Sequence, residues 1–232
     1  AASAAASIEG RGIVKSFGGF TAVDGLTLDI KSGEFVSLIG PSGCGKSTFM
    51  LMAAGLIPTS SGELLVNGKP LREPLTDIGI VFQDHLLLEF RTALENVMLQ
   101  AEIRGLPLAP AKERALELFK KLGISHAVDR YPKQLSGGMR QRVSIARALI
   151  HDPSVLMMDE PFGALDAITR TQIRHDLEML WLEQAKTVVF ITHSIDEAIG
   201  LSDRVLVMSP TPGRIVDEIK IELPRPRPAH LG

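Results

Sequence analysis

Four short runs along the chain consist almost entirely of hydrophobic residues. They cover Phe35–Ile39, Val155–Met158, Val188–Ile191 and Val205–Met208. Runs of this kind are typical of strands buried on both faces, as in a parallel sheet. The stretches between most of the runs are long enough for helices, so the pattern predicts an α/β fold. Between Ile13 and Gly40, before and into the first run, apolar residues recur near period two, which predicts short strands joined by turns.

Two helices are predicted from apolar spacing and end signals. The first covers Pro110–Leu122, with lysines in its last turn and Gly123 directly after it. The second covers Ile195–Leu201 and is opened by Ser194, with Glu197 at capping-box spacing. The second segment lies between two predicted strands, as an α/β alternation requires, whereas the first lies in a longer stretch that is mostly helical.

The domain organisation follows from where this alternation is interrupted. Residues of about 85–150 are predicted to be mostly helical and form a subdomain inserted into one domain of residues 12–223. Residues 1–11 are predicted to lie outside the fold, as a disordered or cloning-derived segment, although 8–11 also fit the start of a first strand. Residues 224–232 alternate proline with basic residues and are predicted to form an extended surface tail.

Composition narrows the classes of partner. The 232 residues carry a formal net charge of -2, which gives no concentrated basic face for a nucleic acid. The single cysteine, Cys44, cannot form an internal disulfide and is compatible with a reducing cytoplasm. No apolar run approaches the roughly 18 residues of a membrane span, so work at a membrane would require a partner.

One glycine-rich segment fits the phosphate-binding loop pattern, after a buried strand and before a helical segment. Its glycines let backbone N–H groups point at phosphate oxygens, and the helix N-terminus adds its positive end. Lys46 would reach the β- and γ-phosphates, and Ser47 would bind Mg²⁺. The candidate nucleotide-binding residues are Gly40, Pro41, Ser42, Gly43, Cys44, Gly45, Lys46, Ser47 and Thr48.

Two carboxylates follow the apolar run at 155–158. Asp159 would hold Mg²⁺, and Glu160 would orient or deprotonate the attacking water. Taken alone, the pair could equally cap a helix ahead of Pro161. The phosphate loop upstream favours the catalytic interpretation.

A second anion-binding device is predicted at Ser136, Gly137 and Gly138, which precede a helix running to about Ile150. They present a hydroxyl and free N–H groups at a helix N-terminus. One nucleotide does not need two such devices from one chain. This motif is therefore expected to serve the nucleotide of a second copy.

With these motifs in this order, the chain resembles the nucleotide-binding subunit of an ABC transporter, an ATPase. The resemblance implies a P-loop NTPase (RecA-like) core with an N-terminal antiparallel β subdomain and an inserted helical subdomain, and two copies closing head to tail around two ATPs. It also assigns roles to residues that are weak signals singly. These are Phe17 and Val23 at the adenine, Gln83 as sensor of Mg²⁺ and the γ-phosphate, Asp166 at the dimer interface, and His193 as the switch histidine at the γ-phosphate.

Residues 161–170, 212–216 and 223–227 resemble the nitrate, sulfonate and taurine importer branch, which implies import of a small anionic nutrient. The implied partners are membrane permease subunits contacting Leu86–Phe90 and an extracytoplasmic binding protein, with the chain peripheral on the cytoplasmic face of the inner membrane. The sequence departs from the branch at residues 84–90, where a Pro-Trp pair is usual. The apolar residues there fit a permease groove and a subdomain core equally well. Export, retrograde lipid transport, and a soluble ABC ATPase acting on DNA or ribosomes are the alternatives.

Overall fold

The computed structural model describes residues 4–228 and contains two sheets. The larger sheet has the order β10-β9-β3-β8-β7-β6, and all its neighbouring strands are parallel except β10, which runs antiparallel to β9. Its strands are β3 (Phe35–Ile39), β6 (Ile78–Val81), β7 (Val155–Asp159), β8 (Thr187–Ile191), β9 (Arg204–Met208) and β10 (Ile215–Lys220). The four apolar runs are thus neighbouring parallel strands, as predicted.

The smaller sheet is antiparallel and has the order β2-β1-β4-β5. Its strands are β1 (Ile8–Phe17), β2 (Phe20–Ile30), β4 (Ser61–Val66) and β5 (Lys69–Pro70). Two hydrophobic clusters divide the core, one on each face of the parallel sheet. Along β7, Leu156 and Met158 belong to one cluster, and Val155 and Met157 belong to the other. This alternation explains why a strand buried on both faces has a continuous apolar sequence.

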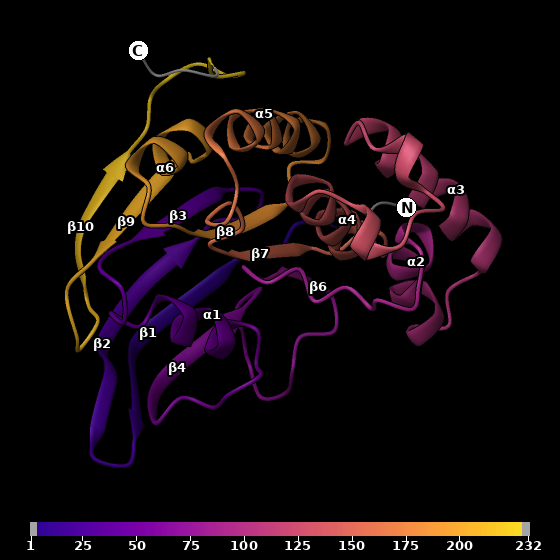
Figure 1. Ribbon diagram of the computed structural model, residues 1–232. Helices are drawn as coiled ribbons and strands as arrows, with labels where there is room; N and C mark the ends of the chain where they lie inside the picture. Colours follow the sequence, from indigo (N-terminus) through magenta and orange to yellow (C-terminus); the bar gives the residue numbers. More distant parts are fainter. Residues whose placement is uncertain (1–3, 229–232) are drawn as a thin grey trace.

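The helices complete a layered α/β structure (Figure 1). They are α1 (Lys46–Ala53), α2 (Ala93–Ile103), α3 (Leu108–Lys121), α4 (Gly137–Leu149), α5 (Ala167–Gln184) and α6 (Ile195–Leu201), with short 3-10 turns η1 (Ser125–Ala127) and η2 (Pro132–Gln134). α1 packs with the antiparallel sheet on one face of the parallel sheet, and α4 and α5 cover the other face. α2 and α3 stand to one side of these layers, and within the described residues no helix is long and apolar enough to span a membrane.

The start of the chain corrects one prediction. Residues 4–11 do not lie outside the fold, because β1 begins at Ile8 and pairs with both β2 and β4. Ahead of it, Ala6 is buried, its N–H donates to the carbonyl of Ser154, and its carbonyl accepts from Thr187 Oγ1 at 2.5 Å. The alanines and serines at the start of the chain show no hydrophobic periodicity, so their sequence did not predict that they are part of the fold. A small side chain such as that of Ala6 can nevertheless fit closely against packed backbone. Residues 1–3 lie outside the described part of the chain.

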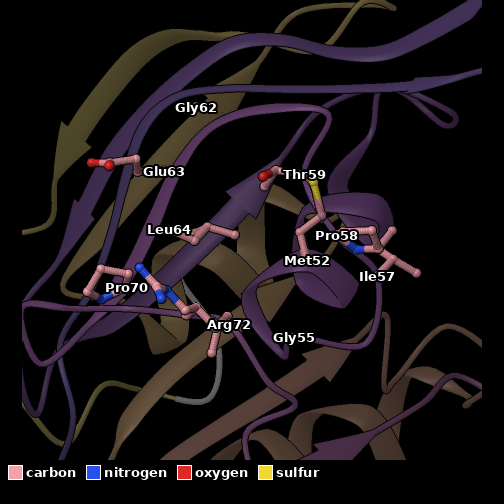
Figure 2. Close-up of a pocket in the computed structure, with 11 residues that line it drawn as sticks. Met52, Gly55, Ile57, Pro58, Thr59, Gly62, Glu63, Leu64, Pro70 and Arg72 are labelled. Carbon is pink, nitrogen blue, oxygen red and sulfur yellow. The ribbon is translucent and has the colours of Figure 1, made fainter.

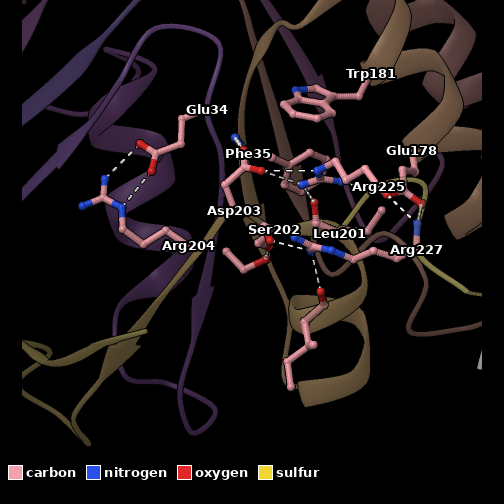
Figure 3. A network of polar contacts seen from close by, with 12 residues as sticks. Glu34, Phe35, Glu178, Trp181, Leu201, Ser202, Asp203, Arg204, Arg225 and Arg227 are labelled. Atoms are coloured by element: carbon pink, nitrogen blue, oxygen red, sulfur yellow. Dashed lines mark hydrogen bonds and ion pairs between the residues drawn. The ribbon is translucent and has the colours of Figure 1, made fainter. Parts of the chain in front are cut away.

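The end of the chain corrects another. Residues 224–228 lack regular secondary structure, as predicted, but they are not a loose surface tail (Figure 3). The Arg225 guanidinium lies over the Trp181 ring at 4.4 Å and pairs with Asp203 at 2.9 Å and Glu178 at 3.0 Å. The backbone N–H of Arg227 also donates to Glu178, and this arginine is only 4% exposed. The segment therefore ties α5 to the start of β9, and residues 229–232 lie outside the description.

Candidate functional site

A cavity of about 400 Å³ opens beside the phosphate loop, at the edge where the parallel strands end. The residues that line it are far apart in sequence and come from β1, β2, the phosphate loop, and the segments at the ends of β6 and β7. They are Phe17, Phe20, Ala22, Ser42, Gly43, Gly45, Lys46, Ser47, Thr48, Gln83, Asp159 and Glu160. All were singled out in the sequence except Phe20 and Ala22. A strand signal could have suggested them, since Phe20 faces Phe17 in the β1–β2 pairing.

The phosphate loop is shaped by glycines that no other residue could replace without strain. Gly43 and Gly45 have φ values of 77° and 101°, in the region that favours glycine. A Cβ at Gly45 would lie 2.8 Å from Val23 Cγ2. Lys46 is buried, and its ammonium donates to the carbonyls of Gly40 at 2.8 Å and Pro41 at 3.0 Å. The loop thus curls around its own positive charge.

Several predicted residues shape this loop and do not line the cavity. Val23 is fully buried and packs against Gly45, while its neighbour Ala22 faces the cavity. Cys44 is also buried, and Gly40 and Pro41 accept the lysine hydrogen bonds. These four residues therefore act on the loop's conformation in this structure.

A second segment supports the loop from outside, and sequence reasoning missed it. Thr211 Oγ1 donates to the carbonyl of Gly43 at 2.7 Å. The N–H of Gly213 donates to the Ala22 carbonyl at 2.9 Å, and a Cβ at Gly213 would collide with the Cys44 carbonyl. The sequence marked residues 212–216 by resemblance alone. A glycine after a proline was the available signal, but nothing local indicated the loop it touches.

Asp159 lies at the end of β7, beside the start of α1. Its carboxylate accepts a hydrogen bond from Ser47. Burial raises the pKa of Asp159, while this hydrogen bond and the charge of Lys46 act in the opposite direction. A carboxylate and a hydroxyl at one point supply the hard oxygen ligands that Mg²⁺ prefers, so the donor set fits that ion.

Glu160 lines the cavity and lies beside His193, with 3.3 Å between Glu160 Oε2 and His193 Nδ1. Glu160 has a φ of 45°, rare for a residue with a side chain, and its N–H is fixed to the Ile191 carbonyl at 2.8 Å. Such conformations concentrate at functional sites. Gln83 is close by, since a Cβ at Gly163 would lie 3.2 Å from Gln83 Nε2. Three of the four predicted catalytic residues, Lys46, Gln83 and Glu160, therefore line the cavity, and the fourth, His193, lies beside Glu160.

The remaining predicted residues do not line this cavity. Ser136 and Gly137 are exposed at the N-terminus of α4, where Ser136 Oγ accepts from Met139 N at 3.3 Å; Gly138 is buried. Asp166 caps α5 by accepting from Thr169 N at 3.0 Å, and this hydrogen bond lowers its pKa. These groups therefore lie at the N-termini of α4 and α5, outside the lining of the cavity beside the phosphate loop.

A further cavity of about 440 Å³ lies between the end of α1 and strands β4 and β5 (Figure 2). Its lining is mixed, with Glu63, Arg72 and Thr59 among apolar residues such as Met52 and Leu64. The groups with the chemistry of phosphate transfer, Lys46 and the carboxylates, all lie in the other cavity. The site of interest is therefore the one beside the phosphate loop.

Comparison with known proteins places this site in a family. The ABC transporter family model matches residues 23–163, and the chain therefore belongs to the ABC transporter family. It is an ABC ATPase, with the P-loop NTPase fold and an ATP site. An uncharacterised ABC transporter ATP-binding protein of Methanocaldococcus jannaschii is 47% identical over 89% of this chain and 77% of its own length.

Two further matches describe the relatives more closely. The taurine import ATP-binding protein TauB of Rhizobium johnstonii is 45% identical over 88% of this chain and 78% of its own length. Among solved structures, the dimeric bacterial ABC transporter cassette MJ0796 has a TM-score of 0.82 and 34% identity, covering 93% of this chain and 99% of that one.

Proposed function

We propose that the chain hydrolyses ATP to drive import of a small anionic nutrient of the sulfonate type through a membrane permease. The observation that carries the chemistry is the convergence of Lys46, Asp159 and the Glu160–His193 pair on one cavity beside the phosphate loop. The similarity to the taurine import protein supports the direction of transport and the substrate class. An extracytoplasmic binding protein would complete such a system.

The hydrolytic roles follow from the geometry. Lys46 would exchange its two carbonyl partners for β- and γ-phosphate oxygens, and the N–H groups of the loop and of α1 would surround the phosphates. Phe17 and Phe20, both half exposed at the cavity wall, offer faces on which a base can stack. Glu160 would orient the attacking water and accept its proton, while His193 holds the γ-phosphate side.

Ser47, Asp159 and Gln83 are the residues that would hold Mg²⁺. The ion neutralises phosphate charge that develops in the transition state. Ser47 and Asp159 already share a hydrogen bond, so their oxygens need little movement to face one cation. Gln83 follows directly after β6, where the chain leaves the parallel sheet towards α2. A contact between Gln83 and the ion could therefore change the position of the segment that leads to the helices.

The second copy would supply Ser136, Gly137, Gly138 and Asp166 to the first copy's ATP. Ser136, Gly137 and Asp166 are exposed, at the N-termini of α4 and α5, where N–H groups favour an anion. The relative MJ0796 was solved as a dimer. Two identical chains related by a two-fold axis would then form two equivalent ATP sites.

The permease would dock at the apolar segment after Gln83, which would hold the chain peripherally at the cytoplasmic face of the inner membrane. Leu86 is 60% exposed and lines a groove of about 420 Å³ together with Phe82 and Leu99. Phe90 is 75% exposed. Leu87 is different, because it packs against the buried helical cluster. Leu86 and Phe90 thus fit the permease-groove interpretation, and Leu87 fits the subdomain-core interpretation. Phe90→Asp is therefore the variant suited to uncouple ATP hydrolysis from transport without destabilising the core.

Replacing Glu160 with Gln tests the proposed chemistry. We expect ATP binding to remain and turnover to fall by at least about a hundredfold, because the amide keeps the side-chain shape but cannot accept the water proton. Turnover would be measured as phosphate release with Mg²⁺, with Glu222→Gln, an exposed acid near the end of the chain, as control. Wild-type turnover in Glu160→Gln would overturn the assignment.

Reconstitution with the permease tests the substrate class. Addition of a small sulfonate together with the binding protein is expected to stimulate ATP turnover, while a neutral sugar leaves it unchanged. Stimulation by the sugar alone would contradict the proposed class and leave the ATPase chemistry intact.

A further inference from the structure

His193 is exposed, so its position must be set through the backbone. Its side chain is 63% exposed, and the described contact of its ring is with Glu160. An imidazole that has to meet a phosphate needs a fixed starting point, because misplacement of about 1 Å is costly in catalysis. The residues on either side of His193 supply that fixation.

Hydrogen bonds close around the His193 backbone on both sides. Thr192 Oγ1 donates to Glu197 Oε2 at 2.5 Å and accepts from Ser194 N at 3.0 Å. Ser194 Oγ in turn accepts from Glu197 N at 3.3 Å. Both neighbours of His193 are thereby tied to Glu197, one through its side chain and the other through its backbone.

Glu197 does more than the helix cap that its spacing predicts. In a capping box its carboxylate would accept from Ser194 N, but that N–H donates to Thr192, and the carboxylate takes the Thr192 hydroxyl. Glu197 is only 5% exposed, and its burial raises its pKa. Burying a carboxylate is costly, and a surface helix cap would not require it.

Arg170 links Glu197 to the turn that precedes α5. Its NH2 group donates to the carbonyl of Leu165 at 3.0 Å, next to Asp166. Its Nε lies 3.6 Å from Glu197 Oε1 and is buried without a hydrogen bond in the described structure. Arg170 therefore connects Glu197 with the turn that carries Asp166, the residue proposed to contact the second copy.

We propose that Glu197 is the positioning residue for His193, acting through Thr192 and Ser194, and that Arg170 connects it to the Leu165–Asp166 turn. Closure of the second copy on that turn would then adjust the switch histidine of the same chain. This inference rests on the proposed function, because it takes the roles of His193 and Asp166 from there.

Thr192→Val and Glu197→Gln test the positioning role. Valine keeps the shape of threonine but removes the hydroxyl that both hydrogen bonds share. We expect kcat to fall about tenfold and KM for ATP to stay within about twofold, because the residues around the phosphates are unchanged. Asp196→Asn is the matched control, since Asp196 is an exposed acid in the same helical turn, and it should keep the wild-type kcat.

A double-mutant cycle separates positioning from a merely structural effect. If Glu197 and Thr192 act through His193, adding Thr192→Val to His193→Ala should slow turnover by less than about twofold beyond His193→Ala alone. Independent, multiplying losses would overturn the inference. If Glu197→Gln fails to fold, Thr192→Val carries the cycle.

Arg170→Met tests the link to the turn. Methionine fills similar space without the donors, and we expect ATP affinity of the isolated chain to be unchanged while kcat falls about threefold to tenfold. An unchanged kcat would overturn the link. Wild-type turnover in His193→Ala would instead refute the proposed role of His193, whereas slow His193→Ala with wild-type Thr192→Val refutes only the inference drawn here.

Discussion

The N-termini of α1 and α4 both offer N–H groups to an anion, but they are built differently. α1 begins after Gly45, which has no capping side chain, and its first turn lies in a cavity with Lys46, Asp159 and Glu160. α4 begins after Ser136, whose own hydroxyl caps the helix at an exposed surface. In the proposed function, the first binds the phosphates of this chain's own ATP, and the second meets the phosphates of the ATP held by a second copy.

Removing the charge of the first site should have the largest effect. In Lys46→Ala we expect the Kd for ATP to rise about a hundredfold or more, because a buried ammonium and its charge-assisted hydrogen bonds to phosphate are lost. Titration calorimetry on the nucleotide-free protein measures this, with the exposed Lys112→Ala as control. Tight ATP binding by Lys46→Ala would mean that the α1 site is not the nucleotide site.

The second site can be altered without disturbing its helix. Aspartate caps a helix as well as serine does, so Ser136→Asp should keep the fold while placing a negative charge towards the partner's γ-phosphate. We expect ATP binding by the single chain within about twofold of wild type and turnover reduced by about a hundredfold. Ser136→Asn, which caps without charge, separates repulsion from loss of the hydroxyl. Weak ATP binding by Ser136→Asp would remove the distinction between the two helix ends.

Mixing the two inactive variants tests whether the helix ends meet across copies. A mixed pair of Lys46→Ala and Ser136→Asp chains would contain one intact ATP site and one doubly altered site. Random pairing makes about half of the dimers mixed, so about a quarter of wild-type turnover should return if the sites act independently. Each variant alone is the control. If turnover does not recover at concentrations that support wild-type turnover, two explanations follow. Either the phosphate loop and the Ser136 helix end serve the same ATP within one chain, or hydrolysis requires two intact ATP sites in the dimer.

Most of the α1 site could be predicted from the sequence alone. The α1 site was predictable because its loop, strand and helix are contiguous, and because Asp159 and Glu160 follow a strand that had to end at the same sheet edge. The prediction of parallel strands and of a mostly helical region at about 85–150 came from the same local patterns, whereas the order of the strands in the sheet was not predicted. Each of these signals lies within about ten residues of its target.

Long-range packing set the limit of the prediction. Thr211 and Gly213 touch the phosphate loop from more than 160 residues away, and no pattern in 211–213 names that partner. Arg225 and Arg227 looked like a solvated tail because arginine usually is, yet Glu178 and Asp203 neutralise Arg225 inside the fold. Burial of a charge depends on where its counter-charge arrives, which only the folded chain decides.

The smallest predicted effect concerns stability. The stability contributions of Asp159 at the α1 site and of Asp166 near the α4 surface should depend on pH in opposite directions. Burial raises the pKa of Asp159, so its stabilising contribution is present below the unfolded value near 3.8 and is lost as pH rises through the folded pKa. Asp159→Asn should therefore raise the melting temperature of the nucleotide-free protein at pH 7.5 by on the order of 2 °C, with a smaller gain near pH 4.

Asp166→Asn is the matched control with the opposite sign. Its backbone hydrogen bond lowers the pKa of Asp166, so its contribution is present above the unfolded value and is lost as pH falls through the folded pKa. Asparagine keeps the cap, and any change in melting temperature at pH 7.5 should be a small decrease that vanishes at low pH. Calorimetry across pH 4 to 8 compares both variants with wild type. A decrease for Asp159→Asn would show that Ser47 and Lys46 outweigh burial, and that the α1 site holds its carboxylate at no cost to the fold.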